Sequence, residues 1–142
     1  MESKFKKITP DLMVRDVTEA VKFYTEKLGF QLAMLVPEGE KAVETRLVAG
    51  KKYVYAMVNR GEVFVMFMSK DVYEEDIPAL RGIPVGASLT LYFDVDHLDG
   101  LYASLKGKGV EVVKDLSATW YGMKEFYIRD CNGYILGFAE RT

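Results

Sequence analysis

The chain has 142 residues, of which 49% are hydrophobic and 28% are charged, and this size and composition fit one globular domain. A net charge of −2 without any basic run disfavours a nucleic acid as the partner. The longest apolar run, Val63–Met68, is far shorter than the roughly 20 residues of a membrane span, and no signal-peptide pattern opens the chain. The single cysteine, Cys131, excludes an internal disulfide and is typical of a protein from the reducing cytoplasm.

The first half of the sequence predicts a strand, a helix, another strand and a hairpin. In chain order these are a strand over 8–14, a helix from Asp16 to Gly29, a strand over 30–36, and hairpin strands over 53–58 and 63–68. Asp16 is expected to cap the helix, with Glu19 in the position of a capping box. Apolar residues at 17, 20, 21, 24 and 28 give that helix one buried face, and Gly29 can end it with a positive φ. The stretch 43–48 is either a short strand or an insertion.

The segment 69–86 holds several prolines, glycines and acids and is the best candidate for a connector. After it the pattern begins again. The predicted elements are a strand over 89–95, a helix capped by Asp96 and stopped by Gly107 and Gly109, a strand over 110–113, and hairpin strands over 125–129 and 134–139.

The two halves therefore share one order of elements, and Asp16 lies as far from Phe30 as Asp96 lies from Val110. We predict an α+β fold of two tandem βαβββ modules, with curved mixed sheets around a cleft and the helices outside. Module one covers about 6–70, the connector about 70–86 and module two about 87–140. The inner faces must be covered, either because the halves close on each other or because a second chain completes the cleft. A homodimer with ligand sites between sheets is the economical solution.

Four segments resemble the vicinal oxygen chelate superfamily, which includes lactoylglutathione lyases, extradiol dioxygenases, fosfomycin-resistance enzymes and bleomycin-resistance proteins. These segments are Ile8–Asp16, Ala20–Phe30, Tyr92–Asp96 and Phe126–Gly133. The resemblance runs from about Ile8 to Glu140, so it covers almost the whole chain.

In the enzymes of that superfamily, His, Gln or Glu side chains on the first and last strands of each half hold a divalent ion that acts as a Lewis acid. Carried over by resemblance, these positions are Thr9, Val65, Thr90 and Gly137. None of them offers a useful metal ligand. The only histidine, His97, falls in the capping turn of the second helix, and strand alternation puts Glu140 on the face opposite Gly137. We therefore predict no metal, no cofactor and no catalytic residue.

The segment Trp120–Phe126 is similar to a stretch of the bleomycin-resistance members, which also lack the metal ligands and sequester drug in clefts between two chains. Here Lys124 replaces an arginine and Tyr121 is an insertion. Trp120 and Tyr121 are candidate ligand-binding residues, because an aromatic side chain at a cleft mouth can stack on a planar ligand or hold a cation. The alternative is that Trp120 anchors the core or a dimer interface.

Strand alternation adds further candidates for the cavity face. If Thr9 and Thr90 face the cavity, the residues two and four positions later face it too. The complete set of predicted ligand-binding residues is Trp120, Tyr121, Asp11, Tyr92, Asp94, Tyr55 and Met13. Carboxylates on aromatic walls favour a cationic or amine-bearing ligand, although Asp94 could equally lie exposed at a strand end.

Three functions remain open on the sequence alone. The first is a metal-independent binding protein that sequesters a planar or cationic small molecule at a dimer interface. The second is a glyoxalase-like lyase or isomerase with an atypical metal or carboxylate site. The third is an interaction domain whose cleft is filled by its partner chain. Bleomycin-like glycopeptides, mitomycin-like quinones and ordinary metabolites all fit the first of these functions.

Overall fold

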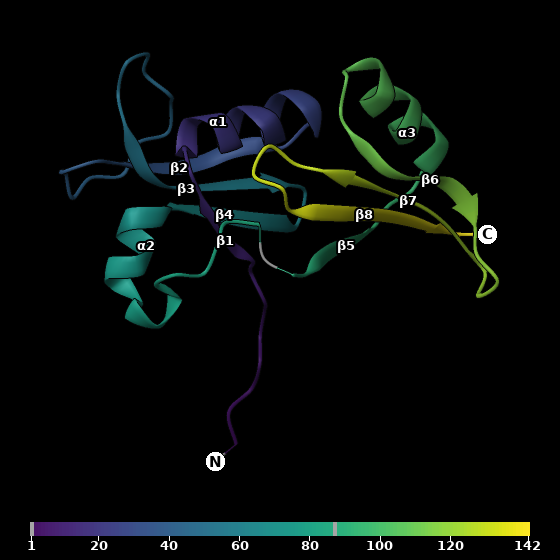
Figure 1. The fold of residues 1–142 in the computed structure, drawn as a ribbon, viewed down its shortest axis with the longest axis horizontal. Coiled ribbons are helices and arrows are strands. Elements are labelled where there is room, and N and C mark those ends of the chain that lie inside the picture. The colour runs from purple at the N-terminus through teal and green to yellow at the C-terminus, as the bar shows by residue number, and fades with distance from the viewer. Residues whose placement is uncertain (1, 87) are drawn as a thin grey trace.

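In the computed structural model, which describes residues 2–86 and 88–142, the chain forms two separate four-stranded mixed sheets (Figure 1). The strands are β1 (Asp11–Val14), β2 (Gln31–Pro37), β3 (Tyr53–Arg60), β4 (Val63–Ser69), β5 (Thr90–Asp94), β6 (Val112–Ala118), β7 (Met123–Arg129) and β8 (Ile135–Arg141). The helical segments are α1 (Val17–Lys22), η1 (Phe23–Lys27), α2 (Lys70–Asp76), η2 (Pro78–Leu80) and α3 (Leu98–Gly107).

The two sheets have the same topology. The strand order is β1-β4-β3-β2 in the first and β5-β8-β7-β6 in the second, with one parallel pair (β1 with β4, β5 with β8) beside antiparallel neighbours. Helices α1 and α3 lie on the same side of the two sheets, so both sheets have their other faces turned the same way (Figure 1). The predicted α+β fold of two tandem βαβββ modules is confirmed.

The first helix begins and ends as its sequence predicts. The Asp16 carboxylate accepts a 3.1 Å hydrogen bond from the Glu19 backbone N–H, and Gly29 ends the turn with a φ of +73°. The predicted apolar face is buried against sheet one, since Val17, Ala20, Val21, Tyr24 and Leu28 are all at most 2% exposed. The last turn is a π-helix rather than an α-helix.

One prediction for the first half needs correction, and the structure adds detail to two other stretches. The first strand starts at Asp11 rather than at residue 8, and Ile8 is 91% exposed. The stretch 43–48 forms only one isolated bridge, between Leu35 and Glu44. The connector contains the helix α2, whose polar sequence buries no residue, and Ala87 lies outside the described residues.

The second helix is capped differently from the prediction. Its N-cap is His97, in a left-handed conformation with a φ of 51°, and not Asp96. The Glu140 side chain accepts hydrogen bonds from the backbone N–H groups of His97 and Leu98 at 3.0 and 3.1 Å, so a carboxylate from β8 supplies the cap. This contact also places Glu140 on the helix side, as strand alternation predicts.

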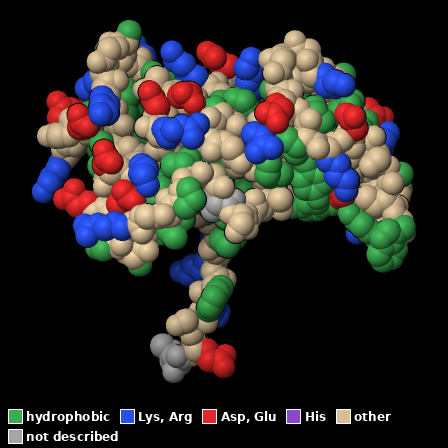
Figure 2. Space-filling view, in the orientation of Figure 1, with side chains coloured by type: hydrophobic (Ala, Val, Ile, Leu, Met, Phe, Trp, Pro, Cys, Tyr) green, Lys and Arg blue, Asp and Glu red, His purple; other side chains and the backbone are tan. Residues whose placement is uncertain are grey.

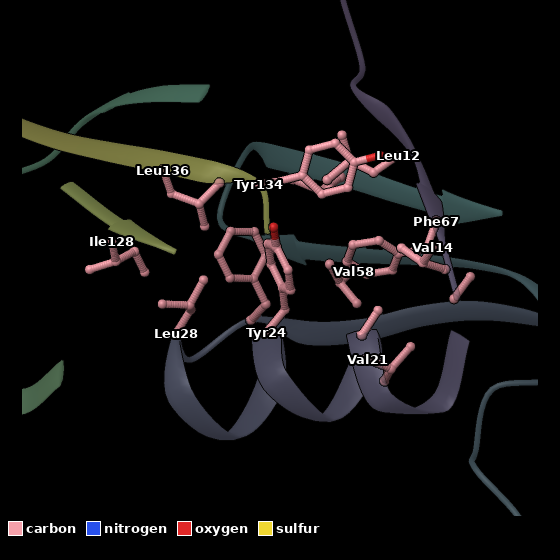
Figure 3. Packing of buried hydrophobic residues seen from close by; sticks show 14 of the residues in the cluster. Leu12, Val14, Val21, Tyr24, Leu28, Val58, Phe67, Ile128, Tyr134 and Leu136 are labelled. Carbon is pink, nitrogen blue, oxygen red and sulfur yellow. The ribbon is translucent and has the colours of Figure 1, made fainter. Parts of the chain in front are cut away.

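The halves meet at a seam where the β7–β8 turn packs against α1 and the end of β1 (Figure 3). The buried Tyr24 phenol donates a 2.8 Å hydrogen bond to Asp130, and the Tyr134 phenol donates a 2.7 Å bond to the Met13 carbonyl. The Arg15 backbone N–H donates to the Asn132 side chain at 3.1 Å. The two halves are thus joined side by side, and their sheets are not hydrogen-bonded to each other.

No helix of the described residues is long and apolar enough to cross a membrane.

Candidate functional site

The face of sheet one that points away from α1 is lined by methionines and one tyrosine. The register pairs Asp11 with Met66, Met66 with Met57, and Met57 with Met34, and these residues therefore share one face. The next row of that face contains Met13, Met68, Tyr55 and Val36. Methionine side chains are flexible and polarizable, so this surface can adapt to ligands of different shape.

The corresponding face of sheet two is aromatic and carries a buried carboxylate. Tyr92 on β5, Gly137 on β8 and Tyr127 on β7 form one cross-strand row, and Glu125 lies two residues from Tyr127 on the same face. Phe126 and Ile128, which alternate with them, are fully buried on the helix side.

Glu125 is held by two tyrosines. The Tyr92 phenol donates to one carboxylate oxygen at 2.6 Å, and the Tyr121 phenol donates to the other at 2.7 Å. Glu125 is only 1% exposed, while Tyr92 and Tyr121 are 47% and 49% exposed. Each phenol uses its one hydroxyl hydrogen in the bond to the carboxylate, and part of each ring faces solvent.

The electrostatics keep Glu125 ionised. Burial by itself would raise the pKa of Glu125, but the hydrogen bonds from Tyr92 and Tyr121 and the nearby Lys114 ammonium outweigh burial and lower that pKa. The hydrogen bond to Glu125 raises the pKa of Tyr92, and the same contact raises the pKa of Tyr121. The site is therefore a carboxylate with two neutral phenols at neutral pH.

Trp120 stands at the tip of the β6–β7 hairpin, next to this carboxylate cluster. It is 95% exposed and packs edge-on against Tyr121, with the ring centroids 5.4 Å apart. Figure 2 shows hydrophobic side chains gathered at the end of the molecule where this hairpin lies. Trp120 therefore does not anchor the core of a single chain, and its ring is accessible to a ligand or to a second copy.

Of the four positions that the resemblance assigned to metal ligands, Thr90 and Gly137 lie on β5 and β8, Thr9 lies before β1, and Val65 lies on β4. Val65 is fully buried and pairs with Val58 on the helix side, so its assignment to the cavity was wrong. The open-face positions on β4 are those of Met66 and Met68. Within residues 2–86 and 88–142, no group of three or more His, Cys, Asp or Glu side chains is arranged to hold a metal ion.

Gly137 has a packing reason to be glycine. A Cβ added there would lie 2.5 Å from Cε2 of the Tyr127 ring. The tyrosine therefore occupies the space that a glutamate at residue 137 would need, and the site uses an aromatic surface in its place.

The structure divides the predicted ligand-binding residues between the two sheets. Sheet one carries Asp11, Met13 and Tyr55, and sheet two carries Tyr92, Asp94, Trp120 and Tyr121. It brings Tyr92 and Tyr121 together on Glu125, whereas Met13 is buried and Asp94 lies exposed at the end of β5. Glu125 and Tyr127 were missed, although the alternation of Phe126 and Ile128 was the available signal.

Asp11 is the unusual carboxylate of sheet one. Its Oδ1 is buried and has no hydrogen-bond partner within the described part of the chain. Burial raises the pKa of Asp11, although a hydrogen bond with Tyr73 partly offsets this effect. Asp11 therefore has one buried carboxylate oxygen without a partner among the described residues, beside Tyr73 of α2, on a face that it shares with methionine and tyrosine side chains.

Comparison with known proteins agrees with the observed fold. Residues 5–138 match the model of the Glyoxalase/Bleomycin resistance protein/Dioxygenase superfamily. Among solved structures, TioX from Micromonospora sp. ML1 is similar with a TM-score of 0.68 at 17% identity, over 97% of this chain and 100% of that chain.

Two further solved structures are similar at the same low identity. A glyoxalase/bleomycin resistance protein/dioxygenase from Nocardioides has a TM-score of 0.73 at 18% identity, over 99% of this chain and 86% of that one. A family enzyme from Burkholderia phytofirmans PsJN has a TM-score of 0.71 at 19% identity, over 94% and 97%. At these identities the likeness concerns the fold alone. No curated protein matches the chain.

Proposed function

The chain belongs to the Glyoxalase/Bleomycin resistance protein/Dioxygenase superfamily, and from that premise we propose that it is a metal-independent small-molecule binding protein. It binds a planar or cationic ligand on the open face of sheet two and sequesters it, as the bleomycin-resistance proteins that it resembles do. In this proposal the protein acts in the cytoplasm and protects the cell from a toxic compound.

One observation carries this proposal, which is the ionised Glu125 at the hydroxyl ends of two half-exposed tyrosines. Its carboxylate attracts a positive charge, and the rings of Tyr92 and Tyr121 present surface on which a cation or a flat ring can lie. A cation over an aromatic ring gains about 0.5–2 kcal/mol, and more where water is excluded. Trp120 beside Tyr121 extends the aromatic surface for a planar ligand.

We propose further that a homodimer completes the site. The two sheets lie side by side and do not cover each other's faces, and among the described residues only α2 contacts sheet one on the side away from α1 (Figure 1). If sheet one of one copy covers sheet two of the other, the methionine face and Asp11 lie opposite the Glu125 cluster. Such an arrangement encloses a ligand between a flexible apolar wall and an aromatic acidic wall.

The experiment that tests this function is a titration of Trp120 fluorescence with metal-free bleomycin, in buffer that contains a chelator. The chain has one tryptophan, so the signal comes from this residue alone. Saturation near one ligand per chain supports sequestration of a bleomycin-like drug. A flat titration removes bleomycin as the ligand, and a panel of planar cations then follows.

Asp11 favours a second candidate function, a lyase or isomerase that uses carboxylate chemistry. A carboxyl group with a raised pKa on a ligand-facing surface is typical of a general acid or base. The test is turnover of the hemithioacetal of methylglyoxal and glutathione in the presence of chelator. Turnover that is lost in Asp11→Asn supports the enzyme, and the absence of turnover in the unaltered protein rejects it.

A further inference from the structure

A cavity lies on the helix side of the molecule, away from the sheet faces described above. Its volume is about 830 Å³, and it runs along one face of α3 between that helix and module one. Its existence follows from a difference between the two hairpin turns that meet the seam. The β7–β8 turn has the residues 130–134 and fills its side of the seam, with Asp130 bonded to Tyr24 and Asn132 bonded to Arg15.

The equivalent β3–β4 turn has only Gly61 and Glu62 between the strands. It borders the cavity through Arg60 and Val63 without filling it. The facing side of α3 has small residues as well. A Cβ added to Gly100 would meet nothing within 4 Å, and Ser104 lines the same groove one turn later. The short β3–β4 turn and the small residues of α3 thus leave this space between the helix and module one.

The floor of this groove is aromatic. Phe93 and Phe138 are stacked with their ring centroids 5.3 Å apart and an interplanar angle of 16°. Both rings line the cavity together with Leu101. Phe93 is only partly buried, since α3 does not cover the β5 edge of the sheet completely. Such a floor suits a flat or extended apolar group.

One end of the groove carries three cations. Lys27 and Lys108 each donate a hydrogen bond to the other's backbone carbonyl, at 2.9 and 3.3 Å, and Arg60 donates to the Leu28 carbonyl at 2.8 Å. These bonds hold three like charges around the ends of η1 and α3, where helix carbonyls partly compensate them. The carboxylates of the groove, Asp94 and Asp96, lie near the other end of α3.

We propose that this groove binds a hydrophobic carboxylate. The carboxylate group of the ligand lies against Lys27, Arg60 and Lys108, and its apolar body extends along α3 over Phe93 and Phe138. Three cations and an apolar floor complement this chemistry, whereas a cationic ligand would meet repulsion at the same end. The site is separate from the Glu125 cluster and does not depend on the function proposed for it.

The probes for this site are 2-naphthoate and 2-naphthamide, which share one ring system and differ in charge. Isothermal titration of the full chain should give a dissociation constant about tenfold lower for 2-naphthoate, as expected of a charge-assisted contact. Lys108→Gln should weaken the binding of 2-naphthoate about tenfold and leave the binding of 2-naphthamide unchanged. Lys106→Gln is the matched control, because Lys106 is an exposed lysine of the same helix that does not line the groove.

A second variant, Ser104→Phe, fills the groove and should abolish binding of both probes. Chemical shifts of the Gly29 and Gly100 amides should move with 2-naphthoate in the unaltered protein. The melting temperature of each variant shows whether the fold is intact. Equal affinity for the two probes, or equal effects of Lys106→Gln and Lys108→Gln, would overturn the proposal. So would a lower sedimentation coefficient in Ser104→Phe, which would show that a second copy occupies the groove.

Discussion

The Tyr24 phenol on the first helix donates a 2.8 Å hydrogen bond to the Asp130 carboxylate in the last hairpin turn, 106 residues away. This bond joins the two modules inside the seam, where Tyr24 is fully buried and Asp130 is 5% exposed. Backbone N–H groups of Asn132 and Tyr134 donate to the other Asp130 oxygen. The carboxylate thus orders the turn and fixes the helix against it.

Removal of that phenol should destabilise the protein. Tyr24→Phe leaves one buried carboxylate oxygen without its donor, which costs about 1–3 kcal/mol in the free energy of unfolding. The matched control is Tyr102→Phe, whose phenol bonds the exposed Asp115 and should change that free energy by less than about 0.5 kcal/mol. Urea unfolding measures both. Equal effects of the two substitutions would show that the Tyr24–Asp130 bond does not couple the modules.

Gly137→Ala should disturb the aromatic row on sheet two. The added methyl group would overlap the Tyr127 ring, and overpacking of this kind costs about 1–3 kcal/mol. Gly100→Ala is the control, because it adds a Cβ in open space within a helix and should stabilise the protein by about 0.5–1 kcal/mol. Thermal unfolding distinguishes the two. An unchanged melting temperature in Gly137→Ala would contradict the placement of the Tyr127 ring.

The stability of the protein should depend on the charge of Glu125 in acid. The pKa of Glu125 is lower in the folded protein than its ordinary value of 4.5, so the unfolded chain binds the proton first as pH falls. The stability that the ionised carboxylate contributes is present above the ordinary pKa and is lost as pH falls through the folded-state value. The Glu125→Gln variant has no carboxylate at this position, so its stability does not fall with pH for this reason. The difference in unfolding free energy between the two proteins should therefore shrink from about pH 6 to about pH 3.

Urea unfolding at several pH values measures that difference. The raised pKa values of Asp11 and Asp130 affect both proteins alike and cancel in the comparison. A difference that stays constant or grows in acid would show that Glu125 is not stabilised as a carboxylate by Tyr92 and Tyr121.

The half-buried methionine face of sheet one predicts self-association. If a second copy covers sheet one, the chain should sediment as a dimer, and Met66→Lys should shift it towards the monomer because a buried unpaired charge is costly. Thr25→Lys, on the opposite side of the same module, should leave the sedimentation coefficient unchanged. A monomer at all concentrations would contradict the proposed dimer.

Much of the fold could be predicted because its determinants are local. The Asp16 cap, the apolar spacing from Val17 to Leu28 and the turn at Gly29 each depend on neighbouring residues. The cap of the second helix was mispredicted, because it is supplied by Glu140 on a strand 42 residues away. A contact between residues so far apart leaves no pattern in the sequence around the helix. The helix α2 was missed because its polar sequence buries no residue.

The candidate site could be predicted only in part for the same reason. Alternation placed Tyr92 on the open face, and Tyr121 was selected as an aromatic residue just before a strand, but their meeting point at Glu125 depends on the pairing of β5, β8 and β7. Val65 was placed on the wrong face because the register of a strand cannot be counted reliably from a module boundary. A slip of one residue turns every side chain of a strand to the other face.

The most direct test of the Glu125 site is the affinity of a planar cation, N-methylacridinium, measured by isothermal titration in the presence of a chelator. The unaltered protein should bind this cation. Glu125→Gln should bind it about tenfold more weakly, as expected when one charged partner of a close contact is neutralised. Glu26→Gln, which removes an exposed carboxylate on the helix side, should leave the affinity unchanged. The same affinity in all three proteins, or no binding to any of them, would contradict a cation site at Glu125.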